Sequence, residues 1–385
     1  MTRLSTQAEL IKLARTLGVS EQELAFLAPI PQESLRHFRA AVSDFLFDEQ
    51  RALVRWLANA ARWLPSMLSA LLARVWLGAS LTARLAAELP AWRVANIARF
   101  LPTPFLADIA TTLDPRCARE LVILLPVSQI KAISAELLAR QDYVTMGRFV
   151  GLLPDHVVSE VAASIPNEGD LLDIVFHIES PNRLDHLINV LPPKRIDAVL
   201  NLVSQPEQSA RWPSVLALLS YVGFALKRSL GERLIALGDS VMSQVIVAAD
   251  EQGLWEDLIP VVASLSPEAQ AKVVKLPEIR EPELLHRILL AIDACRQWPA
   301  MLSLVAHMDE NTRDGLALAL ANLSRKALER VAYAALLRAQ WHTVFDIVHR
   351  LPTAKRDEAI DIMESYLPSL DLETAALLRK LSATV

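Results

Sequence analysis

Residues 89–126 read LPAWRVANIARF, LPTPFLADIATT, LDPRCARELVIL and LP, so a leucine with a proline close behind it recurs every 12 residues. From each leucine, apolar residues follow at +5, +8 and +12, and the pattern resumes after Leu153 and Leu191. A proline at the first position of a helix loses no hydrogen bond, and it disfavours helix in the residue before it. The stretch therefore predicts helices of about two to three turns, each starting at its proline.

A longer repeat follows, marked by Trp212, Trp255, Trp298 and Trp341, which are spaced 43 residues apart. Apolar residues stand four, six, seven and ten positions after each tryptophan. This period is in the range of two- and three-helix repeats. We expect the four tryptophans to fill the core at each repeat boundary. A degenerate earlier copy ends at Tyr143, since LLARQ precedes it as LLRAQ precedes the last tryptophan.

The composition agrees with short helices joined by tight corners. Hydrophobic residues make up 52% of the 385 residues, only 10 are glycine, and hairpin turn sequences are nearly absent. The predicted fold class is all-α, a superhelical array of short helices. We expect an N-terminal helical cap over 1–88, an array of 12-residue units over 89–211, and four tryptophan-led repeats over 212–385 that continue it.

The Leu-Pro pattern over residues 89–203 resembles the N-terminal helical domain of MgtE-type magnesium transporters and the armadillo-like middle region of the flagellar motor protein FliG. That resemblance implies a solenoid of the HEAT/armadillo kind. The sequence departs from the transporter family because it lacks a transmembrane region after the helical domain, the α/β modules that follow it, and dense acidic faces. We therefore carry over the fold and no metal site.

Charge is distributed unevenly along the chain, whose net charge is −5. Residues 31–100 hold nine Lys/Arg against five Asp/Glu, whereas residues 101–385 hold 27 against 36. This balance disfavours nucleic-acid binding, which needs a strong positive field. The basic stretch is a candidate surface for an anionic partner or membrane, and the alternative is an ordinary solvated face. Its candidate residues are Arg36, Arg39, Arg51, Arg55 and Arg62.

Residues 63–83 form the most apolar stretch, with Arg74 near its centre. A central arginine costs about 2.5–3.5 kcal/mol on membrane insertion, so we expect a buried helix pair, and contact with a membrane stays open. The N-terminal stretch carries Glu9 and Lys12 where a signal peptide needs an apolar core. Only two cysteines are present, Cys117 and Cys295, which suits a reducing compartment. The expected location is cytoplasmic.

Two groups of three polar residues each have the spacing that puts all three members on one face of their own helix, where they could bind a metal ion or act as acid and base. Solvated helix faces explain both groups more simply than metal or acid–base chemistry does. No phosphate-binding glycine loop, Walker A sequence or nucleophile elbow occurs. We therefore predict no catalytic residue, no cofactor and no metal site. The two groups are Asp170, Asp173 and His177, and His342, Asp346 and His349.

These features together predict a non-enzymatic helical-repeat scaffold or adaptor that binds other proteins, because solenoids offer long binding surfaces. The alternative is a peripheral membrane or anionic-ligand adaptor that uses the basic 31–100 region. A nucleic-acid-processing protein built on HEAT-like repeats is less favoured by the charge. The partner's identity and the oligomeric state stay open at this point.

Overall fold

In a computed structural model, the chain is described over residues 3–48, 51–61, 63–179, 181–338, 340–369 and 372–382. These residues are all-helical, and none of them forms a β-strand. The chain divides into two compact units, unit 1 (Met1–Leu202) and unit 2 (Val203–Val385). Residues 1–88 thus belong to the same unit as residues 89–202.

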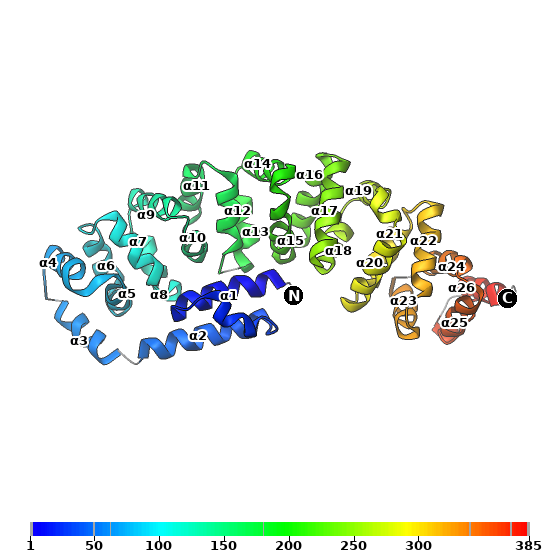
Figure 1. The fold of residues 1–385 in the computed structure, drawn as a ribbon, viewed down its shortest axis with the longest axis horizontal. Helices are drawn as coiled ribbons and strands as arrows, with labels where there is room; N and C mark the ends of the chain where they lie inside the picture. Colours follow the sequence, from blue (N-terminus) through cyan, green and yellow to red (C-terminus); the bar gives the residue numbers. More distant parts are fainter. Residues whose placement is uncertain are drawn as a thin grey trace. The chain divides into compact units, whose positions relative to one another are not determined.

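Unit 1 contains fourteen α-helices within its described residues, two short 3₁₀ turns and one π-helical turn (Figure 1). The α-helices are α1 (Arg3–Leu17), α2 (Gln32–Asp48), α3 (Arg51–Ala61), α4 (Ser66–Leu72), α5 (Gly78–Glu88), α6 (Ala91–Ala98), α7 (Thr103–Thr112), α8 (Pro115–Leu124), α9 (Val127–Ala139), α10 (Tyr143–Val150), α11 (Asp155–Ser164), α12 (Glu168–Phe176), α13 (Leu184–Val190) and α14 (Pro193–Val203). The 3₁₀ turns are η1 (Glu21–Leu27) and η3 (Pro181–Arg183), and the π turn is η2 (Ala73–Leu77).

Unit 2 contains twelve further α-helices within its described residues. They are α15 (Trp212–Tyr221), α16 (Phe224–Ala236), α17 (Asp239–Gln252), α18 (Trp255–Ser264), α19 (Pro267–Val273), α20 (Pro282–Ala294), α21 (Trp298–Val305), α22 (Glu310–Ala321), α23 (Arg325–Arg338), α24 (Trp341–Arg350), α25 (Thr353–Glu364) and α26 (Leu372–Ser382). Short 3₁₀ turns are η4 (Pro206–Arg211), η5 (Pro277–Arg280) and η6 (Leu367–Ser369).

The Leu-Pro pairs form the corners between consecutive helices of unit 1. Leu89 ends α5 in an extended conformation (ψ 150°), and Pro90 follows at the N-cap of α6 (φ −57°, ψ 135°). The carbonyl of Pro90 accepts hydrogen bonds from Arg93 N (2.9 Å) and Val94 N (3.2 Å). The prediction that proline is the first helical residue is therefore wrong by one position at this corner. Proline suits the cap equally, because its φ is also compatible with extended backbone.

The short helices of unit 1 pack mainly on the helix two places away. One row is formed by α3, α5, α7, α9, α11 and α13, each in contact with the next member. A second row contains α4, α6 and α8, and α10 packs on α12 in the same way. Helices this short are marginal alone, so each depends on the apolar side chains that meet between the rows.

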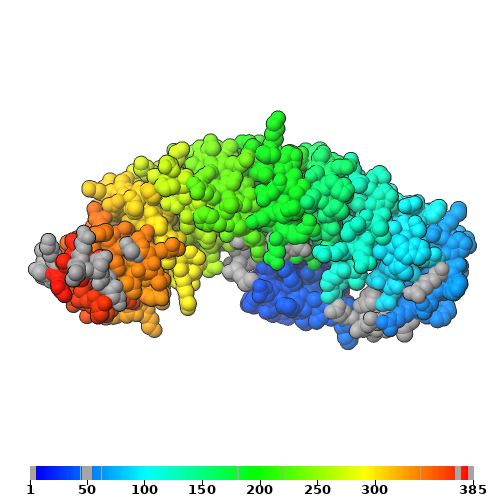
Figure 2. Space-filling view, turned by 180° about the vertical axis from the view of Figure 1, so that it is seen from behind, coloured from blue at the N-terminus to red at the C-terminus, as the bar shows by residue number. Residues whose placement is uncertain are grey.

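The first two long helices form a hairpin that folds back along unit 1. In Figures 1 and 2, α1 and α2 lie side by side against the later helices of the same unit. Arg15 on α1 pairs with Asp142, which caps α10, 127 residues away in sequence. This hairpin therefore covers a part of the helix stack that is distant from it in sequence.

In unit 2, each of the four tryptophans is the first residue of its helix, namely α15, α18, α21 and α24. Two residues before Trp255 and Trp298 stand Gly253 (φ 65°) and Arg296 (φ 58°), both left-handed. Gln141 (φ 55°) occupies the same position before Tyr143, the first residue of α10. The degenerate copy that the sequence indicates thus shares this backbone feature.

The residue after each left-handed position closes the preceding helix through a bond to a carbonyl five residues back. These bonds are Leu254 N to Ala249 O (2.8 Å), Gln297 N to Ile292 O (2.9 Å) and Asp142 N to Leu137 O (2.9 Å). This is the Schellman pattern of helix termination. It turns the chain sharply, so the aromatic residue can begin the next helix.

A polar triad recurs beside two of the tryptophans. Trp298 Nε1 donates to Asp293 Oδ1 (2.9 Å), and the same carboxylate pairs with Arg330. One repeat earlier, Trp255 Nε1 donates to Asp250 Oδ1 (3.3 Å), and Asp250 pairs with Arg287 (2.7 Å). The ring is buried while its N–H reaches a partner, which is the usual requirement for a buried indole.

Candidate functional site: an exposed tryptophan surface and an apolar groove

The eight tryptophans of the chain divide evenly between two environments. Those of unit 2 are buried, since Trp212, Trp255, Trp298 and Trp341 are 0%, 6%, 3% and 4% exposed. Those of unit 1 are solvent-exposed, since Trp56, Trp63, Trp76 and Trp92 are 67%, 91%, 81% and 59% exposed. Four exposed indoles within 37 consecutive residues, 56–92, are more than scattered surface apolar residues would give.

Large apolar side chains also line the outside of the α4–η2 helix. They follow two i+4 rows, so they share one side of the helix. Ser69, Ala70 and Ala73, which are small, are buried on the opposite side. The helix therefore packs inward through small residues and presents its large ones outward. We call this exposed set the outer stripe, which consists of Met67, Leu71 and Val75, and Leu68, Leu72 and Trp76.

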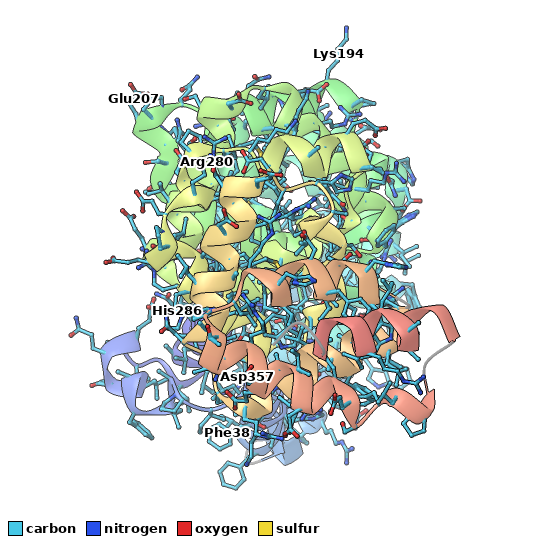
Figure 3. The ribbon with its side chains drawn as sticks, turned by 90° about the vertical axis from the view of Figure 1, so that its right-hand side faces the viewer. Phe38, Lys194, Glu207, Arg280, His286 and Asp357 are labelled. Atoms are coloured by element: carbon cyan, nitrogen blue, oxygen red, sulfur yellow. The ribbon has the colours of Figure 1, made fainter. Side chains whose placement is uncertain are left out.

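The prediction of a buried helix pair over residues 63–83 is therefore wrong. The continuous helical run Ser66–Glu88 is long and apolar enough to cross a membrane, and only 28% of its most apolar window is buried. Helix α4 and turn η2 lie at the end of unit 1 that is distant from α14 (Figure 1). Figure 3 shows a further exposed aromatic residue, Phe38 of α2, pointing away from the protein.

The stretch that contains the outer stripe is rich in arginine. Residues 51–100 contain seven arginines, and their single acidic residue is Glu88. Arg74 lies on η2 beside the outer stripe and is exposed, and Arg55 is half-exposed beside Glu88 (3.6 Å). Arg93 has a structural role, since its guanidinium donates to the carbonyls of Ala61 (2.7 Å) and Leu64 at the α3–α4 turn.

A long apolar groove runs between the two helix rows of unit 1. Its volume is about 460 Å³, and every helix from α3 to α13 contributes lining side chains. Among the described residues, the lining contains no charged side chain, and its hydroxyl-bearing members are Ser69, Thr82, Ser134 and Thr145. The volume falls within the range of about 300–1,000 Å³ typical of small-molecule sites.

The groove reaches the surface at the tryptophan-rich end of unit 1. Three of its lining residues are exposed large apolar side chains, Trp56, Leu72 and Trp76. Farther along, its lining is buried at Leu106, Val161 and Leu187 and half-buried at Ile133 and Phe149. Ser69 also lines the groove, and its hydroxyl is buried without a hydrogen-bond partner among the described residues.

The five arginines that the sequence suggests as an anionic-partner surface do not occupy one environment. Arg36 and Arg39 both bind the buried carboxylate of Glu9 (3.5 and 3.2 Å), and Arg39 also pairs with Glu179 (3.0 Å). Arg55 is exposed. The side chain of Arg51 and all of Arg62 lie outside the described residues.

Glu9 is the centre of a charge network between the α1–α2 hairpin and the helices beneath it. It also accepts from Lys12 (3.2 Å), which is buried as well. Burial by itself would raise the pKa of Glu9, but the charges of Lys12, Arg39 and Arg36 outweigh burial and hold that pKa below its ordinary value. Burial lowers the pKa of Lys12. These charges are committed to internal ion pairs.

Within the group Asp170, Asp173 and His177, Asp170 and His177 contact different residues of unit 1. Tyr143 donates its hydroxyl proton to Asp170 Oδ1 (2.7 Å). Burial, together with the positive charges of Lys12 and Arg15, lowers the pKa of His177 to about 4. His177 is therefore neutral at physiological pH and packs against α10, where Gly147 leaves room for it.

In the second group, Asp346 pairs with Arg313 (3.0 Å) and Arg350 (3.2 Å), while His342 and His349 are exposed. Among the described residues, no group of three or more His, Cys, Asp or Glu side chains is arranged to hold a metal ion. Neither cysteine takes part in a disulfide.

No protein-family model and no curated protein matches this sequence. The sequence alone predicts only part of this site. The two i+4 rows of large residues on α4–η2, opposite Ser69, Ala70 and Ala73, form a pattern that can be read from the sequence, but which side faces solvent cannot. The groove has no sequence signal, because its width depends on the spacing of the two helix rows.

Proposed function

We propose that this protein is a non-enzymatic helical-repeat scaffold of the solenoid type that docks on an anionic membrane surface through residues 56–100 of unit 1. The observation that carries this proposal is the exposure of all four unit 1 tryptophans together with the outer stripe. Exposed apolar helix faces with Trp, Leu and Met, flanked by arginines, are typical of helices that lie in the membrane interface. Indole rings favour the same depth.

Charge supports an anionic surface in particular. Each Lys or Arg near an anionic leaflet contributes about 1 kcal/mol to binding. Arg55, Arg74 and Arg99 are exposed, and the single acidic residue of 51–100 is Glu88. The cytoplasmic leaflet carries such lipids. A cytoplasmic location, which the two cysteines favour, is compatible with this surface. Docking in the plane of the membrane also tolerates Arg74, whose charge would oppose insertion across it.

Vesicle flotation of the full-length protein tests the proposal. The wild type is expected to float with phosphatidylglycerol-containing vesicles and much less with pure phosphatidylcholine. Trp76→Glu and Arg74→Glu are each expected to lower binding at least tenfold. Leu337→Glu is the control, since Leu337 is an exposed apolar residue of unit 2 (60%). Membrane docking would be refuted if the wild type did not float with anionic vesicles, or if Trp76→Glu bound them as strongly as Leu337→Glu does.

A second function, protein binding by unit 2, is favoured by a separate observation. Val247, Leu290 and Tyr333 are exposed apolar residues spaced 43 apart, on α17, α20 and α23. In-register exposure on successive repeats is the usual form of a solenoid binding face. A photo-crosslinker at position 290 is expected to give one discrete adduct, while position 252, which is exposed and polar, gives none. Equal labelling at both positions would contradict this function.

A further inference from the structure

The apolar groove of unit 1 excludes charged and strongly polar occupants. None of the lining residues that the structure describes is charged, and Thr82 and Thr145 already use their hydroxyls, on Gly78 O (2.6 Å) and Asp142 (2.7 Å). Apolar cavities of this kind stay dry and accept apolar ligands. An occupant must therefore be a hydrocarbon over most of its length.

The dimensions of the groove favour a thin, extended occupant. Packed helices lie about 8–10 Å apart, so the row from α3 to α13 extends about 40–50 Å. A volume of about 460 Å³ spread along such a row is narrow. An α-helix with its side chains is about 10–12 Å wide, which is too wide for this space. An unbranched hydrocarbon chain is much thinner than a helix and fits along part of this length.

The open end of the groove supplies the remaining features of an amphiphile site. Trp56 and Trp76 line the groove and also belong to the exposed tryptophans. Arg74 is exposed on the same turn as Trp76 and presents a positive charge at this end. Ser69, whose buried hydroxyl is unpaired among the described residues, lines the groove from α4. A chain inside with an anionic head outside satisfies all of these groups.

We propose that the groove of unit 1 binds the acyl chain of an anionic membrane lipid. The chain enters between Trp56 and Trp76, and Arg74 faces the head group. This inference rests on the proposed membrane docking for the source of the lipid, because the groove opens within the surface that docks. The bound chain fills space that the side chains of unit 1 leave empty.

Fluorescence of cis-parinaric acid, a free fatty acid, tests the groove in the absence of vesicles. The full-length protein is expected to enhance the fluorescence, and palmitate is expected to displace the probe. Ser134→Trp places an indole in the groove from α9 and should weaken binding at least tenfold. Ala132→Trp, on the exposed side of the same helix, is the matched control and should bind as the wild type does. Ala110→Trp blocks the groove independently from α7.

Several outcomes would overturn the assignment. The first is no binding by the wild type, and the second is binding as strong as that of the wild type in both Ser134→Trp and Ala110→Trp. The third is a dimer in light scattering that Ser134→Trp converts to a monomer, which would make a second copy the occupant. Arg74→Glu is expected to reduce the preference for palmitate over monopalmitoylglycerol, and an unchanged preference would remove the anionic head from the proposal. Flotation of Ser134→Trp distinguishes acyl-chain binding in the groove from membrane docking. This variant should lose binding of the fatty acid but retain binding to anionic vesicles.

Discussion

Unit 1 and unit 2 are built from helices of similar length, yet they place their tryptophans in opposite environments. In unit 2, four indoles spaced 43 residues apart are buried, each at the start of a helix. A cavity between α22 and α25 in that unit measures only about 30 Å³. In unit 1, the four indoles face solvent and the interior holds a groove of about 460 Å³.

The difference shows what fills the space between two rows of short helices. A 12-residue unit contributes Leu, Ile, Val and Ala at its inward positions, and these side chains do not span the gap in unit 1. In unit 2, a buried indole stands at the start of a helix every 43 residues. The burial of one large ring per 43 residues thus accompanies the packing of unit 2, whereas unit 1 exposes its tryptophans and holds the groove.

The largest expected effect comes from exchanging a buried and an exposed indole for alanine. Trp298→Ala should destabilise unit 2 by about 3–5 kcal/mol, because it leaves a cavity and removes the donor to Asp293. Trp76→Ala should change stability by no more than about 0.5 kcal/mol. Denaturant unfolding followed by circular dichroism measures both. Equal losses would mean that the tryptophans of the two units do not differ in role.

Unit 1 depends on buried charge where unit 2 depends on aromatic packing. Glu9→Ala should destabilise the α1–α2 hairpin by about 3–5 kcal/mol, because Lys12 and Arg39 lose a shared buried partner. Hydrogen exchange of α1 and α2 reports this loss directly. Glu33→Ala, an exposed position on α2, is the control. Unchanged protection in Glu9→Ala would show that apolar contacts alone hold the hairpin.

The same network makes the stability of unit 1 sensitive to acid. The pKa of His177 is about 4 in the folded protein and 6.5 ordinarily, so between these values the unfolded chain binds a proton that the folded protein does not. Stability contributed by neutral His177 is complete above pH 6.5 and declines as pH falls to 4, by up to about 3 kcal/mol. His177→Asn should flatten this slope in hydrogen exchange of α10 and α12.

His342→Asn, which changes an exposed histidine of unit 2, should leave the pH slope of unit 1 as it is in the wild type. A slope that persists in His177→Asn would assign the acid sensitivity to the carboxylates of the network instead.

The smallest expected effect concerns the left-handed residues that precede the tryptophans. A non-glycine residue in this conformation costs about 1–2 kcal/mol, so Gly253→Ala should lower the stability of unit 2 by about 1 kcal/mol. Arg296→Gly should raise it by up to about 1 kcal/mol, since glycine adopts positive φ readily. Thermal unfolding measures both shifts. A stabilising Gly253→Ala would contradict the proposed role of this turn.

The sequence by itself determined the all-helical class and the corners, because proline chemistry and a 12-residue apolar pattern act within one or two turns of helix. The prediction placed the proline of the α5–α6 corner one residue too far into its helix, since both the cap and the first turn accept the same φ. The 43-residue spacing located the starts of α15, α18, α21 and α24 for the same local reason.

Only the tertiary structure decided which side of each helix faces solvent. Residues 63–83 are apolar enough to be read as core, yet Ser69, Ala70 and Ala73 pack inward because small side chains let helices approach closely. The sequence suggests Arg36 and Arg39 as surface charges, yet in the folded hairpin both pair with Glu9, and Arg39 also pairs with Glu179. Whether an interior is filled or hollow depends on the distance between helix rows, which long-range packing sets and local pattern does not.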